Sequence, residues 1–213
     1  QISKMIGFWG VIGTLSRSTI LRSGLLLASA WENAESTLHV TAPEVFLYDD
    51  ISVDSCLTLQ KELRENGVLS RTIQQQLKLE TYPPISLHIQ SDGGTLSSAL
   101  NVCDFIESFD VPIHTHVEGL VASAASLISV CGDYRYMTKR STMLIHQPSA
   151  EASGSVAFIQ DEAHNMRLMY DLMIDIYVEH SKLKKNDVIR MIENEKYLNA
   201  SDCLRFGLID EIV

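Results

Sequence analysis

Strand-like and helix-like segments alternate along this chain from about residue 44 onward, and this alternation restricts the fold more than any other feature. Residues 45–48 and 85–90 have the apolar pattern of strands. After the first of these, Cys56, Leu59 and Leu63 recur at helical spacing. Strands that alternate with helices favour a parallel sheet covered by helices, with the functional site at the strand ends. We therefore predict the α/β class.

The remaining elements follow the same pattern. We predict that the first helix has Ser52 as its N-cap and ends at Gly67. A glutamine-rich helical extension and a loop should follow, because the prolines at 83 and 84 prevent a continuous helix into the next strand. The other predicted elements are a helix with the apolar residues Leu96, Leu100, Cys103 and Ile106, strands at 111–117, 134–137 and 142–145, and a helix rich in small residues after Gly119.

Residues 156–182 form the longest predicted helix, about seven turns at 3.6 residues each. A helix of this length exceeds what a compact domain usually needs. We predict that it projects from the domain and lays its apolar side chains, Phe158, Ile159 and Leu172 among them, against another subunit. An ordinary core helix is the alternative.

Composition limits the compartment and the partners. With 213 residues, 46% of them apolar, the chain can bury one sizeable core. The net charge of −10 and the lack of a basic block argue against a nucleic-acid partner. The four cysteines, at 56, 103, 131 and 203, have no Cys-X-X-Cys spacing. We interpret them as reduced packing residues in a reducing compartment, cytoplasm or plastid stroma, and predict no metal site and no cofactor.

The first 36 residues are predicted to form a separate N-terminal arm. Their two apolar runs are interrupted by serines and arginines, so neither is long enough to span a bilayer, and we predict a soluble protein. The arm has no acidic residue before Glu32, as in organelle transit segments. An arm that packs on a neighbouring subunit is an equal alternative.

Three short motifs in fixed order indicate the chemistry. They are Ser-Asp-Gly-Gly at 91–94, Gly-Leu-Val-Ala-Ser-Ala at 119–124 and Met-Leu-Ile-His-Gln-Pro at 143–148, and each follows a strand-like run. Ser123 lies where a helix should begin, and His146 has the imidazole that suits a general base near neutral pH. Backbone N–H donors, a nucleophile and a base would meet at neighbouring strand ends, which is the requirement of acyl transfer. A serine hydrolase is the leading hypothesis.

With the closing motifs at 197–200 and 206–210, residues 45–213 resemble the proteolytic subunit of the Clp protease. The resemblance implies a crotonase-like ββα superhelix with a projecting long helix, and divides the chain into the arm at 1–36 and a peptidase domain at 37–213. It implies Ser123 as nucleophile, His146 as base, and the backbone N–H groups of Gly94 and Ala124 as oxyanion donors. It also implies stacked heptameric rings of like or unlike subunits, a Clp-family ATPase chaperone and unfolded protein substrates.

Two positions depart from the family pattern. Asp92 stands where the family usually has proline, and Glu195 stands where it usually has the aspartate of the triad. Glutamate can orient an imidazole, but its extra methylene must be accommodated. Asp187 and Glu193 are alternatives for this role. The six other histidines, including His114, His116 and His164, have no comparable motif around them and are interpreted as structural or surface groups.

Three hypotheses therefore stand. The first is an active serine endopeptidase inside a ring-shaped, ATPase-fed chamber. The second is a catalytically inactive structural subunit of such a ring, which Glu195 and Asp92 favour. The third is a crotonase-fold enzyme acting on an acyl-CoA thioester, although no cationic cluster for the nucleotide end is evident.

Overall fold

One mixed sheet organises the part of the chain that the computed structural model describes, residues 42–213. The predicted N-terminal arm and its boundary at residue 36 lie outside these residues. The strands are β1 (Glu44–Leu47), β2 (Ile85–Ser91), β3 (Ile113–Ala122), β4 (Tyr134–Met137), β5 (Thr142–Leu144), β6 (Tyr197–Asn199) and β7 (Glu211–Ile212). The helices are α2 (Val53–Leu77), α3 (Leu96–Ser108), α4 (Ala124–Val130), α5 (Val156–Glu179), α6 (Lys185–Asn194) and α7 (Ala200–Phe206).

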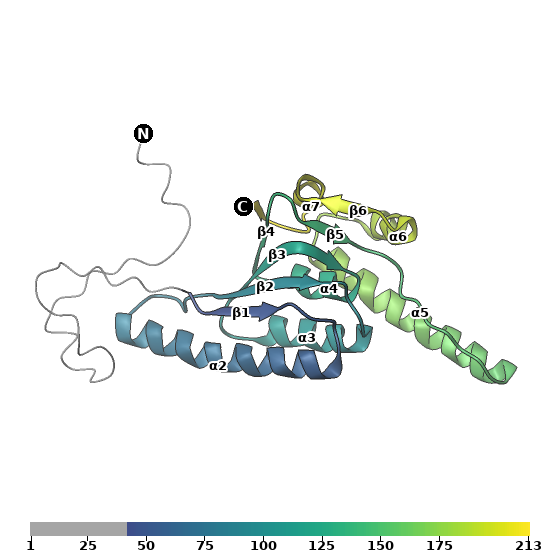
Figure 1. Ribbon diagram of the computed structural model, residues 1–213, viewed down its shortest axis with the longest axis horizontal. Coiled ribbons are helices and arrows are strands. Elements are labelled where there is room, and N and C mark those ends of the chain that lie inside the picture. The colour runs from purple at the N-terminus through teal and green to yellow at the C-terminus, as the bar shows by residue number, and fades with distance from the viewer. Residues whose placement is uncertain (1–41) are drawn as a thin grey trace, which may run out of the picture.

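The sheet has the order β1-β2-β3-β4-β7, and every neighbouring pair along it is parallel. The C-terminal part of β3, residues 120–122, pairs in parallel with β5. β5 in turn pairs with β6 in antiparallel orientation. Figure 1 shows α2 and α3 on one face of the sheet, below β1 and β2. The predicted α/β class is confirmed, because each parallel connection passes through a helix or a long loop.

The core lies between the sheet and these helices. Ile85, Leu87 and Ile113 of β2 and β3 are fully buried, and so are Leu63 of α2 and Leu127 of α4. Among the described residues, no helix is both long enough and apolar enough to cross a bilayer. All four cysteines are free and buried, as expected for packing residues.

The first helix does not end at Gly67, and this prediction is wrong. α2 runs through Gly67 to Leu77 and ends at Lys78, which adopts the left-handed conformation with φ 54°. The predicted helical extension is the second half of α2. A Cβ on Gly67 would lie 2.6 Å from the ring of Phe109, so the glycine permits close packing instead of ending the helix.

The long helix α5 projects from the domain as predicted, and its end at Glu179 is three residues earlier than expected. Its buried side chains, Met173, Ile174 and Tyr177, all lie in the second half. In the first half Val156, Phe158 and Ile159 are exposed, and Figure 1 shows this half extending beyond the sheet. An ordinary core helix is therefore excluded, and a partner subunit on the exposed half stays a prediction.

Candidate active site

Ser123 occupies a strained turn between a strand and a helix. β3 ends at Ala122, α4 begins at Ala124, and Ser123 between them has φ 53° and ψ −128°. A non-glycine residue held at such dihedrals costs about 1–3 kcal/mol and persists only where its surroundings enforce it. The amide of Ser123 donates to the carbonyl of Leu144 at 2.8 Å, which fixes the turn against β5. This geometry resembles the sharp turn that exposes the nucleophile in many serine hydrolases.

His146 reaches the same edge of the sheet from the neighbouring strand. β3 and β5 run parallel with Ala122 opposite Leu144, so both chains leave the sheet in the same direction. His146 follows the end of β5 by two residues, and its side chain is about a quarter exposed. Parallel pairing therefore brings the predicted nucleophile and the predicted base to one place.

Glu195 arrives from the opposite direction. β5 and β6 are antiparallel with Leu144 opposite Tyr197, and extending this register by two residues places His146 opposite Glu195. The Nδ1 atom of His146 lies 3.8 Å from Oε1 of Glu195. This is an ion-pair distance, longer than a hydrogen bond. Glu195 is also the C-cap of α6 in the left-handed conformation, with φ 44°.

The two other acidic candidates do not contact His146. Asp187 pairs with Arg190 within α6. Glu193 is exposed and lies in the last turn of α6, two residues before the C-cap Glu195. Among the described acidic residues, only Glu195 forms an ion pair with His146. Asp92 is exposed beside the Gly-Gly turn.

The glycines of the first motif lie directly against Ser123. A Cβ on Gly93 would be 2.6 Å from the Cβ of Ser123, and Gly93 has φ 101°. Gly94 bridges to Ile51, and this bridge uses the amides of Ile51 and Thr95. In a parallel bridge the amide of Gly94 itself therefore points away from Ile51.

Ala124 offers the second amide. It is the first residue of α4, and the first N–H groups of a helix have no partner within the helix. Ala124, Gly94, Ser123 and His146 all line one cavity of ≈ 330 Å³, called the Ser123 cavity below. Its other lining residues are Thr95, Leu96, Ser97, Gln147, Pro148, Ser149, Met166, Met169 and Met173. The four residues that the sequence predicts as nucleophile, base and oxyanion donors thus line the same cavity.

A comparison with protein families agrees with this geometry. The family model described as Clp protease matches residues 44–213. The chain belongs to the Clp protease family. The resemblance seen in the sequence and the Clp protease fold, with its parallel-dominated sheet and projecting helix, are thereby confirmed. Membership supports a Clp-type protease over the acyl-CoA hypothesis.

The Clp protease domain contains a buried contact that sequence analysis missed. Ser126 and Ser129 look like packing residues in the sequence, but Ser126 Oγ donates to the carbonyl of Ser123 at 2.6 Å. The same hydroxyl lies 2.7 Å from the hydroxyl of Tyr177, whose pKa is raised by burial. Ser126 therefore connects the Ser123 turn to α5. Its position one turn after Ser123 was the available signal.

The methionines of α5 are the second feature that the sequence did not reveal. Met166, Met169 and Met173 line the Ser123 cavity from the projecting helix. Their spacing along α5 predicts one helix face, and in the sequence this face was interpreted as an interface with another subunit. Methionine is flexible and polarisable, so these side chains form an apolar wall that can adapt to a substrate.

Three described histidines of the sheet, His88, His114 and His116, have aromatic ring contacts, in agreement with a structural role. The rings of Phe46, His88, His116 and Tyr136 stack across β1 to β4 with centroids 4.6–4.8 Å apart. Burial, together with the neighbouring His88, lowers the pKa of His116 to about 4. His88 Nδ1 lies 3.0 Å from Glu118, while Nε2 of His88 and of His116 is buried without a partner.

Proposed function

We propose that this Clp protease domain is an active serine endopeptidase with Ser123 as nucleophile, His146 as general base and Glu195 as the orienting acid. One observation carries the proposal. Ser123, in its strained turn, lines the same cavity as His146 and as Gly94 and Ala124, whose backbone amides are the proposed oxyanion donors. Backbone strain at a partly buried serine, beside two amides available as donors, is typical of a nucleophile that the fold pre-organises.

In the first half of the proposed reaction, Ser123 Oγ attacks the carbonyl carbon of the scissile peptide. His146 Nε2 accepts the hydroxyl proton and becomes imidazolium, which the carboxylate of Glu195 stabilises at Nδ1. The carbonyl oxygen becomes an oxyanion and accepts hydrogen bonds from Gly94 N–H and Ala124 N–H. Loss of one such donor costs about 2.7–4 kcal/mol in other serine peptidases.

In the second half, the tetrahedral intermediate collapses. His146 donates its proton to the leaving amine, the C–N bond breaks and Ser123 carries the acyl group. Water then attacks the ester carbonyl while His146 takes one of its protons, and collapse releases the carboxylic acid and returns the proton to Ser123. No group besides these residues and water is required.

The site as described is a resting arrangement. Among residues 42–213 the hydrogen bonds of the structure do not include one between Ser123 Oγ and His146, and the His146–Glu195 separation is 3.8 Å. Catalytic hydrogen bonds are often long before substrate binds and shorten in the Michaelis complex. We infer that bound substrate brings the imidazole closer to both partners.

The family relationship supports the remaining parts of the proposal. The protein would act in a stacked ring, fed by a Clp-family ATPase that unfolds its protein substrates. The exposed apolar side chains of the first half of α5 support assembly, because such a row is costly to leave in water. The four free cysteines support a reducing compartment, cytoplasm or plastid stroma.

A second candidate is a catalytically inactive ring subunit. Glu195 favours it, because its side chain is 59% exposed and too far from Nδ1 for a hydrogen bond. An acid that is weakly coupled to the imidazole orients it poorly. This candidate predicts an intact ring with an unreactive Ser123.

A fluorophosphonate serine probe separates the two candidates. The assembled native chain should be labelled, Ser123→Ala should abolish labelling, and Glu195→Ala should slow it. Absence of labelling in a correctly assembled native ring would refute the active peptidase and favour the structural subunit.

A further inference from the structure

A second cluster of reactive side chains lies where three helices meet, away from the Ser123 cavity. Glu107 of α3, Cys131 at the end of α4 and His180 at the end of α5 each offer one ligand atom, and these atoms all lie within 4.8 Å of one another. All three residues line a separate cavity of ≈ 600 Å³. The proposed reaction uses none of them.

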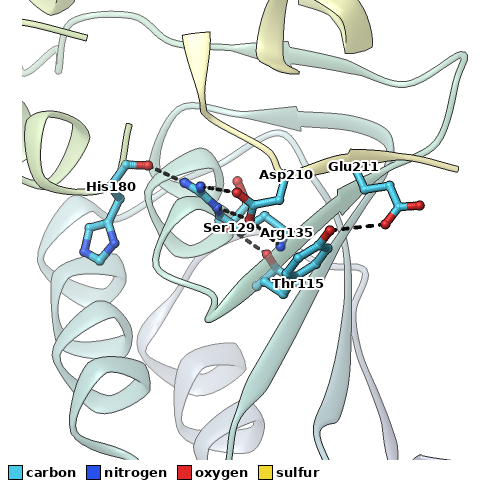
Figure 2. Close-up of polar contacts among 7 residues, drawn as sticks. Thr115, Ser129, Arg135, His180, Asp210 and Glu211 are labelled. Carbon is cyan, nitrogen blue, oxygen red and sulfur yellow. Dashed lines mark hydrogen bonds and ion pairs between the residues drawn. The ribbon is translucent and has the colours of Figure 1, made fainter. Parts of the chain in front are cut away.

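His180 is held in place through its backbone. Its N–H donates to the carbonyl of Ile176 at 2.9 Å, and its carbonyl accepts a hydrogen bond from Arg135. Arg135 is itself fixed by Asp210, which accepts from Nε at 2.9 Å and from Nη2 at 2.7 Å. Figure 2 shows the carbonyl of His180 turned towards Arg135 and the imidazole directed away from it. The imidazole is thus held on the side of His180 that faces away from Arg135.

The imidazole of His180 points to Glu107. Its Nε2 atom lies 2.8 Å from Oε1 of Glu107. Side-chain exposure is 24% for His180 and 41% for Glu107, so solvent and ions can reach the pair through the cavity. A metal ion can replace the shared proton between a carboxylate and an imidazole, because each atom has a lone pair to donate.

Cys131 is the buried member of the cluster. It is 5% exposed, and its thiol contacts Glu107 and the thiol of Cys103. Cys103 and Glu107 are four residues apart on α3, so they share one face of that helix. The cluster therefore combines sulfur, nitrogen and oxygen ligands, with sulfur on the buried side.

We propose that Glu107, Cys131 and His180 form a site for a single zinc ion, with the fourth coordination position open to the cavity. Zn²⁺ accepts thiolate, imidazole and carboxylate ligands together, in tetrahedral geometry at about 2.0–2.3 Å. Such bond lengths place ligand atoms about 3.3–3.8 Å apart. Small side-chain rotations would bring the cluster to that spacing. Thiolate and imidazole select zinc over the harder ions Mg²⁺ and Ca²⁺.

The site would clamp the helices that carry the active site. Its three ligands come from α3, α4 and α5, and α4 begins at the strained Ser123 turn. α4 has seven residues, so the zinc site and the nucleophile lie at opposite ends of a helix about 10 Å long. Bound zinc would hold the base of the projecting helix α5 to this unit. The inference is independent of whether Ser123 is an active nucleophile.

Metal binding to the tag-free, reduced full-length chain tests the proposal. After chelator treatment and dialysis, the protein is titrated with Zn²⁺ in a calorimeter and with Co²⁺ in a spectrophotometer. The expected result is one ion per chain, with a thiolate-to-cobalt charge-transfer band. Cys131→Ser should abolish that band, and His180→Asn and Glu107→Gln should each weaken zinc binding at least tenfold.

Two matched variants serve as controls. Cys203→Ser alters a buried cysteine in α7, and His164→Asn alters an exposed histidine on α5. Both should bind zinc like the native chain. The proposal fails if the native chain binds no zinc, or if His180→Asn and Glu107→Gln bind it as tightly as His164→Asn does. His180 and Glu107 are partly exposed, so His180→Asn and Glu107→Gln remain informative even where Cys131→Ser does not fold.

Discussion

His146 and Glu195 lie opposite each other in the extended β5–β6 register, with Nδ1 of the histidine 3.8 Å from Oε1 of the glutamate. The backbone of Glu195 is in the left-handed conformation. Glu195 is one of three described non-glycine residues with positive φ. Ser123 is another of the three. Two of the proposed triad residues therefore hold backbone conformations that cost energy, which is typical of functional sites.

The role of Glu195 can be separated from its backbone strain. Asparagine and aspartate tolerate the left-handed conformation better than glutamate. We expect Glu195→Asn to slow fluorophosphonate labelling by at least tenfold, and by up to about 10⁴-fold if the triad is fully coupled. Glu195→Asp keeps the carboxylate and should retain more activity than Glu195→Asn. Labelling rates at one pH give the comparison.

Glu193→Gln is the control for this pair, because it removes a nearby exposed charge from the same helix. It should label like the native chain. Equal rates for Glu195→Asn and the native chain would exclude Glu195 from the triad.

Gly93→Ala should inactivate the site. The added Cβ would lie 2.6 Å from Ser123 Cβ and 2.7 Å from the carbonyl of Ala122, at a φ of 101° that alanine rarely adopts. We expect a stability loss of about 1–3 kcal/mol in urea unfolding together with loss of labelling. Gly154→Ala also places alanine at a positive φ, but the atoms nearest its new Cβ belong to the Phe158 side chain and not to the Ser123 turn, so it should label normally. Normal labelling of Gly93→Ala would contradict the described turn.

The Ser126–Tyr177 contact should be measurable as a coupling energy. Ser126→Ala leaves the fully buried Tyr177 hydroxyl without its 2.7 Å partner, and this should cost about 1–3 kcal/mol. Tyr177→Phe should cost about 1 kcal/mol, since Ser126 keeps its bond to Ser123. The double variant should lose less than the sum of the two. Urea unfolding at one protein concentration measures all three, and strict additivity would show that the hydroxyls do not interact.

The stability of the domain should fall on mild acidification because of His116. Its pKa of about 4 lies below the ordinary 6.5, since burial and the neighbouring His88 disfavour imidazolium. Between pH 6.5 and about 4, His116 therefore binds a proton in the unfolded chain but not in the folded chain. The stability contributed by the neutral His116 ring is fully present above pH 6.5 and is lost as the pH falls towards 4. The free energy of unfolding should decrease by less than about 1.4 kcal/mol per pH unit, because the ring is partly exposed.

His116→Phe tests this dependence, because phenylalanine keeps a ring in the stack between His88 and Tyr136. The groups that face it are His88 on β2, Tyr136 on β4, and His114 and Glu118 on β3. Unfolding free energies at pH 7 and pH 5 should differ less in the variant than in the native chain. The control His164→Gln should keep the native difference, and an unchanged difference in His116→Phe would refute the assignment.

The methionine wall, formed by Met166, Met169 and Met173, should determine which substrate side chain is preferred immediately before the scissile bond. Three methionines of α5 line the Ser123 cavity, so large apolar side chains should be preferred over small ones. Met169→Trp fills the cavity and should lower the ratio of kcat/KM values for leucyl over alanyl peptides at least tenfold. Leu168→Trp changes the exposed neighbour on the same helix and should keep the native ratio. Fluorogenic peptides provide the measurement.

Much of this protein is predictable because local patterns encode it. Apolar periodicity distinguishes strands from helices, and parallel strands separated by helices place their ends at one edge of a sheet. Ser123 and His146 each follow such a strand, so the sequence alone predicted that they would meet. Gly67 shows the limit, because a glycine that permits packing against Phe109 has the same local signature as one that ends a helix.

The sequence by itself determined the α/β class and the projecting helix, and it predicted Ser123 and His146 as nucleophile and base, because these inferences depend on residues close together along the chain. Only the tertiary structure decided which acid faces His146, since this depends on the antiparallel pairing of β5 with β6. It also decided the strain at Ser123, the methionine wall and the Glu107–Cys131–His180 cluster. These features join side chains from separate elements, and local periodicity does not specify how distant elements pack.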